Sequence, residues 1–169
     1  MSSFRGFLTL LALFTAGVAS AGVEVVLDKR PAGTFYTGGV IQGYGKLDML
    51  VDTGSSVLVI DQTMLDQLLA AGQARYSHDL GGLMADGRQR QVPVYRLEAL
   101  RIGESCWVRD IDAAVFPAGS RAILGMNVLT RLAPFTFSAD PPQLSLNQCL
   151  ATPGEIASAG SGAAAAASK

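Results

Sequence analysis

Apolar positions along this chain occur mostly in short runs, and turn-forming residues separate one run from the next. Alternating or continuous apolar runs of this kind, bounded by Gly, Pro, Asp or Asn, predict β-strands rather than helices. The ranges predicted as strands are 23–28, 34–41, 49–51, 57–60, 92–102, 106–108, 111–116, 135–137 and 143–146.

Two short segments instead have the spacing of helices. One runs from Gln62 to about Ala71, with Asp61 as its N-cap, Gly72 at its end and an apolar face of Leu65, Leu68 and Leu69. The other covers 127–132. Many short strands with Gly-rich turns and two small helices predict an all-β, barrel-like domain.

Both ends of the chain differ from its middle. Residues 1–21 have a basic start, an apolar stretch and an Ala-Ser-Ala cleavage pattern, which predicts a signal peptide removed after Ala21. An uncleaved membrane anchor is the alternative. Residues 22–150 form the predicted domain, and 151–169 are so rich in Ala, Gly and Ser that we expect a disordered tail. The leader predicts export, to the periplasm or outside the cell.

The net charge and the small number of metal-binding residue types exclude several classes of function. The net charge is −1, and no basic patch with interleaved aromatics is present, so nucleic acid is not an expected partner. One His and two Cys cannot build a metal site, and no cofactor is expected. Cys106 and Cys149 form either a disulfide, which an exported protein favours, or two buried free thiols.

The stretch with the clearest chemistry lies between two apolar runs. Asp52 follows the run 49–51, and Thr53, Gly54 and Ser55 come directly after it, before the run 57–60 begins. Burying a carboxylate at the end of a strand costs free energy unless its charge is shared, hydrogen-bonded or used. The simpler interpretation is that Asp52 only begins a turn.

A second segment far downstream favours catalysis. Ile123 and Leu124 precede Gly125, and a short amphipathic segment follows. Together, Leu50-Val51-Asp52-Thr53-Gly54-Ser55 and Ile123-Leu124-Gly125 resemble the retropepsin-like aspartic proteases over about residues 34–146. The resemblance implies a closed barrel or sandwich that forms a two-fold dimer, a catalytic Asp52, and a Gly125 segment packed beneath it.

The resemblance also implies roles for neighbouring residues. Thr53 would cross-link the loops of two subunits, Gly54 would keep the loop close to substrate, and Ser55 would hydrogen-bond Asp52. Peptide hydrolysis by this chemistry needs two carboxylates across one water, and the chain has a single Asp-Thr-Gly. We therefore expect a homodimer that acts on peptides, with the N-terminal strand and 143–146 in its shared sheet.

A long hairpin is predicted between 81 and 97, with Asp86-Gly87 at its turn. Its polar, Gly-bearing arms are typical of an ordinary surface hairpin. By position it resembles the family's flap, and Met84, Ala85, Asp86 and Gly87 would then contact substrate. It lacks the doubly Gly-rich tip of the viral enzymes.

Two other functions compete with proteolysis. The sequence Val51-Asp52-Thr53-Gly54-Ser55-Ser56 also fits the phosphate loop of actin-like and sugar-kinase ATPases, but that fold needs two large α/β domains. The second alternative is a non-catalytic dimeric module that holds extended peptides on the same scaffold.

Overall fold

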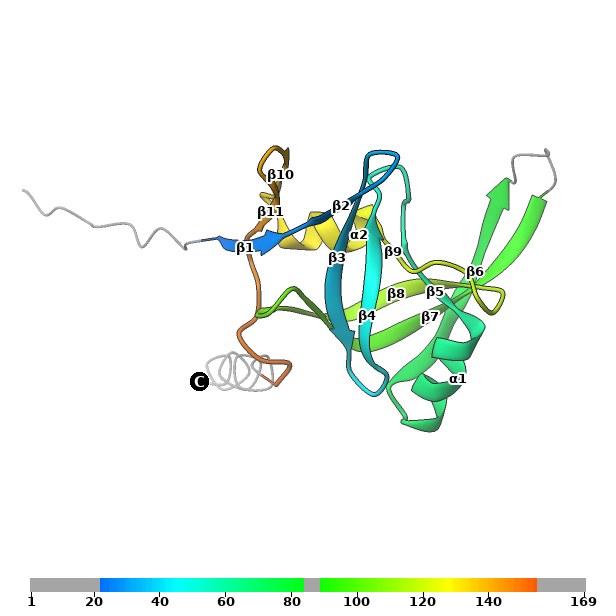
Figure 1. Cartoon of the computed structure of the whole chain (residues 1–169). Helices are drawn as coiled ribbons and strands as arrows, with labels where there is room; N and C mark the ends of the chain where they lie inside the picture. The colour runs from blue at the N-terminus through cyan, green and yellow to red at the C-terminus, as the bar shows by residue number, and fades with distance from the viewer. Residues whose placement is uncertain (1–21, 84–88, 155–169) are drawn as a thin grey trace, which may run out of the picture.

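The computed structural model describes residues 22–83 and 89–154. Figure 1 shows a curled body of strands with a small sheet at one end and a long two-stranded hairpin extending from the other. The predicted leader, the hairpin tip and residues 155–169 of the tail lie outside the described residues. Within the described ranges, no helix is long and apolar enough to cross a membrane.

Eight strands form the larger sheet, and most follow the predicted apolar runs. They are β2 (Asp28–Arg30), β3 (Thr34–Ile41), β4 (Gly45–Val51), β5 (Leu58–Asp61), β6 (Ala74–Leu83), β7 (Gln89–Ile102), β8 (Cys106–Phe116) and β9 (Ile123–Leu124). Their order is β2-β3-β4-β9-β5-β8-β7-β6, and β3 also pairs with β7, which curls the sheet around its core. The predicted all-β class is confirmed.

A separate three-stranded sheet contains β1 (Val23–Val26), β10 (Thr136–Ala139) and β11 (Pro142–Leu146), in the order β1-β11-β10. The single strand expected over 23–28 is wrong, because the chain leaves this sheet at Leu27 and enters the larger one at β2. Leu27 is buried, and its amide N–H donates to the Pro142 carbonyl. Burial of this side chain therefore fixes the point where the strand divides.

The helices are short and lie against the barrel. They are α1 (Gln62–Ala70), α2 (Met126–Leu129) and the 3₁₀ turn η1 (Thr130–Leu132). Asp61 caps α1 as predicted, since its Oδ1 accepts from the Met64 amide at 2.8 Å. Leu65 and Leu68 are buried, but Leu69 is 44% exposed, so its placement on the buried face was wrong.

The hairpin of β6 and β7 is longer than predicted. Its first arm begins at Ala74, where the sequence is too polar to signal a strand, because most of these side chains remain exposed while the backbone pairs with β7. β8 is one strand and not two, since its ladder with β7 continues through Arg109 opposite Ala99.

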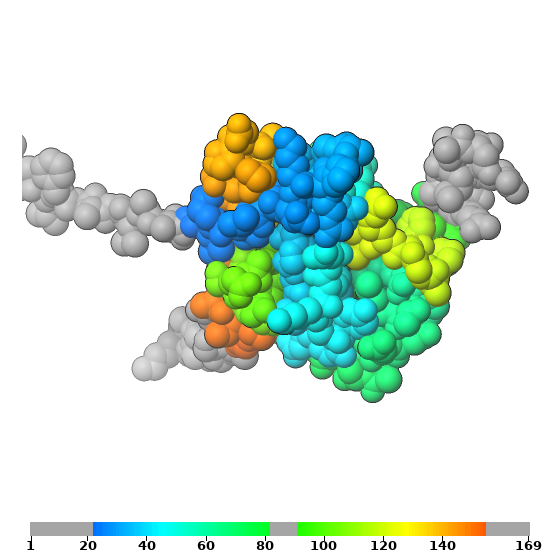
Figure 2. Space-filling view, viewed as in Figure 1, coloured from blue at the N-terminus to red at the C-terminus, as the bar shows by residue number. Residues whose placement is uncertain are grey.

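The core lies inside the curl of the large sheet and beneath α1 and α2. Its largest fully buried side chains are Ile41, Met49, Leu58, Ile60, Leu68, Leu97, Leu100, Ile102, Ile111, Leu124, Leu129 and Leu132. Figure 2 shows the closely packed surface of this body, with the β2–β3 segment beside the β10–β11 hairpin.

A disulfide joins Cys106 to Cys149, with the two Cα atoms 4.8 Å apart. This settles the alternative between a bridge and two free thiols. The backbone next to it is also paired, because Trp107 and Leu150 exchange N–H to carbonyl hydrogen bonds of 3.1 and 3.0 Å. The chain after β11 is thereby fastened to the start of β8.

Candidate active site

Asp52 begins a tight loop at the end of β4. Its amide N–H donates to the Leu124 carbonyl at 3.2 Å, and its own carbonyl accepts from the Ser55 amide at 3.2 Å. Its carboxylate Oδ1 accepts from the Gly54 amide at 2.8 Å. The acid is half-buried, whereas Thr53 and Gly54 are exposed. A carboxylate is thus held in one orientation, with access to solvent, by backbone groups.

Glycine at position 54 has a steric reason. A Cβ built there would lie 3.1 Å from Asp52 Oδ1, which is closer than most real Cβ contacts. The amide that binds the carboxylate can therefore approach it without a side chain in the way.

Ser55 bonds Asp52 as expected, but through the backbone, since its amide donates to the Asp52 carbonyl at 3.2 Å. Its Oγ donates to the Val57 carbonyl at 2.8 Å, and the Asp52 carboxylate accepts from the Gly54 amide. The hydroxyl closes the turn into β5 instead. A Ser two residues before a carbonyl readily bonds the backbone in this way, and sequence alone does not show which acceptor it takes.

The structure brings the second predicted segment directly to this loop. β9 pairs parallel with β4, Leu50 opposite Ile123 and Val51 opposite Leu124, and antiparallel with β5. The acid is therefore placed by a strand that is hydrogen-bonded to the Ile123–Leu124 segment.

Gly125 lies against the backbone of the Asp52 loop. A Cβ at Gly125 would approach the Val57 carbonyl carbon to 2.5 Å and the Ser55 carbonyl oxygen to 3.0 Å. This close packing lets the Met126 amide donate to Ser55 at 2.8 Å and the Asn127 amide donate to Ser56 at 3.1 Å. The start of α2 thus supports the loop from beneath.

Asn127 is a site residue that the sequence analysis missed. Its Oδ1 accepts from the Leu58 amide at 2.8 Å, and its Nδ2 donates to the Asp112 carbonyl at 2.7 Å. One side chain therefore joins the start of β5 to β8 next to the Asp52 loop. The sequence did show a polar residue at the start of a predicted helix. It could not show the partners of Asn127, because Leu58 and Asp112 are 69 and 15 residues away along the chain.

An ion pair links the same region to the hairpin. Arg96 on β7 donates from Nε and Nη2 to the two carboxylate oxygens of Asp112, at 2.8 and 2.7 Å. The hydrogen bonds from Arg96 lower the pKa of Asp112, while partial burial acts in the opposite direction. The Asp112 carboxylate therefore binds Arg96 of the hairpin, and the Asp112 carbonyl binds the Asn127 side chain.

The proposed substrate-contacting residues Met84, Ala85, Asp86 and Gly87 lie outside the described residues. The arms that lead to them are paired up to Leu83 opposite Gln89. A hollow of about 530 Å³ lies beside the returning arm, lined by Gln62, Gln91, Val92, Pro93, Val115, Phe116, Pro117 and Ala118.

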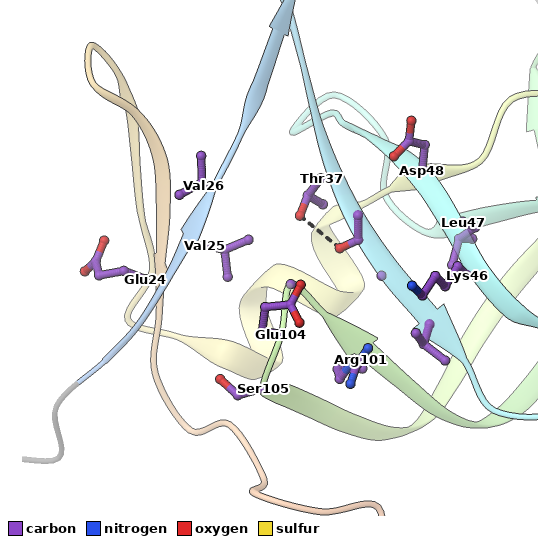
Figure 3. A pocket seen from close by; sticks show the side chains of 14 residues that line it. Glu24, Val25, Val26, Thr37, Lys46, Leu47, Asp48, Arg101, Glu104 and Ser105 are labelled. Atoms are coloured by element: carbon purple, nitrogen blue, oxygen red, sulfur yellow. Dashed lines mark hydrogen bonds between the residues drawn. The ribbon is translucent and has the colours of Figure 1, made fainter.

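A second hollow has a volume of about 750 Å³, and residues 52–55 are not part of its lining. Figure 3 shows it between β1 on one side and β3 and β4 on the other, with Glu104 and Arg101 at the β7–β8 turn. Asp52 is not among its lining residues. In the described part of the chain, no group of three or more His, Cys, Asp or Glu residues could hold a metal ion.

Comparisons with known proteins agree with this geometry. Residues 37–131, more than half of the chain, match the family model described as "gag-polyprotein putative aspartyl protease". The fold is similar to the crystal structure of a retropepsin-like aspartic protease from Rickettsia conorii, with a TM-score of 0.56 and 22% identity, covering 76% of this chain and 92% of that one. A comparison with curated proteins finds no significant match.

Proposed function

Because this chain belongs to the gag-type aspartyl protease family and has a retropepsin-like fold, we propose that it is an endopeptidase whose active site forms from Asp52 of two copies. The observation that carries the proposal is the loop geometry. One solvent-accessible carboxylate is fixed by the Gly54 amide, on a loop that the Gly125 segment supports from beneath.

The proposed chemistry follows from bringing two such carboxylates together. Two carboxylates about 3 Å apart cannot both ionise, so they share one proton. The ionised one takes a proton from a water between them, and the protonated one donates to the oxygen of the scissile carbonyl. Water attacks the carbonyl carbon, and the amine leaves with the proton that the first carboxylate took from the water, without a covalent enzyme intermediate.

A second copy is needed because one chain supplies only one Asp-Thr-Gly carboxylate, whereas the proposed reaction uses two. The chain has one Asp-Thr-Gly, and the other carboxylates near the loop are committed elsewhere: Asp112 binds Arg96, and Asp61 binds the amides of Met64 and Gly119. The exposed Thr53 and Gly54 leave the face that a partner loop would meet open to solvent.

We also propose that the chain is exported. Its leader pattern and the Cys106–Cys149 disulfide support this, because disulfides persist in oxidising compartments such as the periplasm or the extracellular space.

Substitution of the acid tests the proposal. Asp52→Asn should abolish cleavage of a casein-type substrate while leaving folding unchanged. Asp66→Asn on α1 is the matched control, since Asp66 accepts from the Gln62 side chain at 2.8 Å and lies outside the catalytic loop. Full turnover by Asp52→Asn would overturn the assignment. Peptide binding without cleavage by the wild-type chain would support the non-catalytic module instead.

A mixing experiment tests the shared site. Re-equilibrating wild type with an equal amount of Asp52→Asn should leave about a quarter of the dimers with two acids, and therefore about a quarter of the activity of an all-wild-type sample at the same total concentration. A fall to one half would indicate that each chain works alone.

A further inference from the structure

Asp52 shares one face of the large sheet with side chains from neighbouring strands. Residues directly opposite each other in a β-ladder lie on the same face, and so do residues two apart along a strand. Leu50 on β4 lies opposite Tyr36 on β3 and opposite Ile123 on β9. Leu50 also stands two residues before Asp52. The face that carries the acid therefore continues over Leu50 to the Tyr36 ring.

Two arginines lie close to the Tyr36 ring. The central guanidinium carbon of Arg30 is 3.7 Å from the ring centroid, and that of Arg121 is 5.9 Å from it. Both distances are within the roughly 6 Å over which the face of an aromatic ring attracts a cation. Tyr36 itself is only 6% exposed, so the two cations cover it. The face that carries Asp52 is therefore bordered by positive charge on its Tyr36 side.

The two arginines differ in whether their charge is already compensated. Arg30 forms ion pairs with the carboxylates of Asp28 and Asp48. Arg121 is exposed, and within the described residues its guanidinium has neither an ion pair nor a hydrogen bond. Arg121 is therefore the cation of this pair whose charge remains available to a bound molecule.

The backbone on both sides of Arg121 is fixed. On one side, the buried Asp61 carboxylate accepts from the Gly119 amide through Oδ2 at 2.8 Å. On the other side, the Ala122 carbonyl accepts from the Leu50 amide at 3.0 Å. Because these bonds hold the loop in place, Arg121 can bind an anion without the cost of ordering its backbone.

Strand geometry indicates how far this cation lies from the reacting bond. Neighbouring strands are about 4.8 Å apart, and two residues along a strand span about 6.6 Å. Tyr36 lies one strand away from Leu50, and Asp52 lies two residues beyond Leu50, so the Cα atoms of Tyr36 and Asp52 are roughly 8 Å apart. An extended peptide advances about 3.3 Å per residue, so a side chain about two to four residues from the scissile bond meets Arg121.

We propose that Arg121 selects peptides that carry Asp or Glu about two to four residues from the bond that is cut. The carboxylate of the peptide pairs with the guanidinium beside Tyr36. The inference rests on the proposed function. Since that function uses two copies, a peptide across the two-fold axis meets one Arg121 on each side of the bond, and acids on both sides are favoured together.

Matched peptides test the selection. A peptide library first identifies a bond that the wild-type chain cleaves, and Glu is then placed at each of the second to fourth positions on either side, with Gln as the neutral match. At pH 6 these Glu side chains are ionised, because their ordinary pKa is about 4.3. At the best position, replacing Glu by Gln should lower kcat/KM by up to about fivefold, the contribution of an exposed ion pair. Replacement on both sides should lower it by up to about 25-fold.

Charge reversal, with a control on the opposite face of the same strands, assigns the effect to Arg121. Arg121→Gln should remove the preference for Glu over Gln, and Arg121→Glu should reverse it. Lys29→Glu is the control, because Lys29 lies 5.8 Å from the centroid of the Phe35 ring, and Phe35 faces away from the neighbouring Tyr36. This variant makes the same change of charge and should keep the wild-type preference. A preference that survives in Arg121→Glu, or that Lys29→Glu removes as completely, overturns the proposal.

Binding to the Asp52→Asn chain separates this proposal from the proposed function. Fluorescence anisotropy compares labelled Glu and Gln peptides on that chain with and without Arg121→Gln. Cleavage by wild type with no preference for Glu refutes the selection and leaves proteolysis standing. If nothing is cleaved but the Glu peptide binds more tightly, and Arg121→Gln removes the difference, proteolysis is refuted and Arg121 stands as a peptide-binding residue. If there is neither cleavage nor Glu-dependent binding, both proposals fail.

Discussion

Replacing Gly125 by Ala should displace the Asp52 loop and weaken peptide cleavage without changing any acid. Gly125 has φ −95° and ψ 177°, a conformation open to any residue, so the requirement for glycine is one of space and not of backbone strain. An added Cβ would lie 2.5 Å from the Val57 carbonyl carbon, and closer still to its oxygen. Real Cβ contacts under 3.0 Å are essentially never seen. The loop and α2 must therefore separate by at least about half an ångström.

The cost of that separation can be worked out from the bonds it stretches. The Asn127 amide lies 3.1 Å from the Ser56 carbonyl, and half an ångström more takes it beyond hydrogen-bonding distance. Overpacking costs about 1–3 kcal/mol, and a weakened backbone bond about 1 kcal/mol. We expect the free energy of unfolding to fall by about 2–4 kcal/mol and peptide cleavage to fall further, since the loop holds the acid.

Urea unfolding and turnover of a casein-type substrate measure the two effects. Gly38→Ala is the control, because a Cβ at Gly38 on β3 meets nothing within 4 Å and its φ is not positive. If Gly125→Ala unfolds at the same urea concentration as Gly38→Ala and cleaves at the wild-type rate, the supporting role of the Gly125 segment is refuted.

Two further predictions concern the polar links behind the loop. Asn127→Leu leaves the Leu58 amide and the Asp112 carbonyl without their partner, so the free energy of unfolding should fall by about 2–4 kcal/mol, whereas Asn127→Asp, which keeps the acceptor, should lose less. Equal losses for the two variants would contradict this account. Because Arg96 lowers the pKa of Asp112 in the folded state, the pair stabilises the fold fully above about pH 4 and loses its effect as the pH falls through the folded-state pKa. In urea melts from pH 6 to pH 2, Asp112→Asn should therefore lose less stability than wild type, by about 1 kcal/mol, and parallel curves would refute the assignment.

Much of the fold follows from local sequence signals. Thr34–Ile41 was predicted with the bounds of β3, because Gly33 and Gly43 stand close to its two ends and both have positive φ. Asp61 was predicted as the cap of α1 because the preference of Asp for this position has a simple cause, a bond to an unpaired amide.

The errors arise where distant contacts decide the structure. β6 contains Arg75, Ser77 and His78 and has no clear periodicity, and it is a strand only because β7 pairs with it. The Ser55 hydroxyl could bond several nearby oxygens, and the fold selects Val57. The sequence also could not show that β11 lies between β1 and β10, since pairing order depends on segments more than a hundred residues apart.

The disulfide has a consequence for chain integrity. Cys106 and Cys149 close a covalent ring that contains β8, β9, α2, β10 and β11, so it includes the Gly125 segment and Asn127. A single backbone cut anywhere between these cysteines leaves the two fragments joined. For a protease exposed to its own activity, one nick inside this ring would separate the pieces on a gel only after reduction.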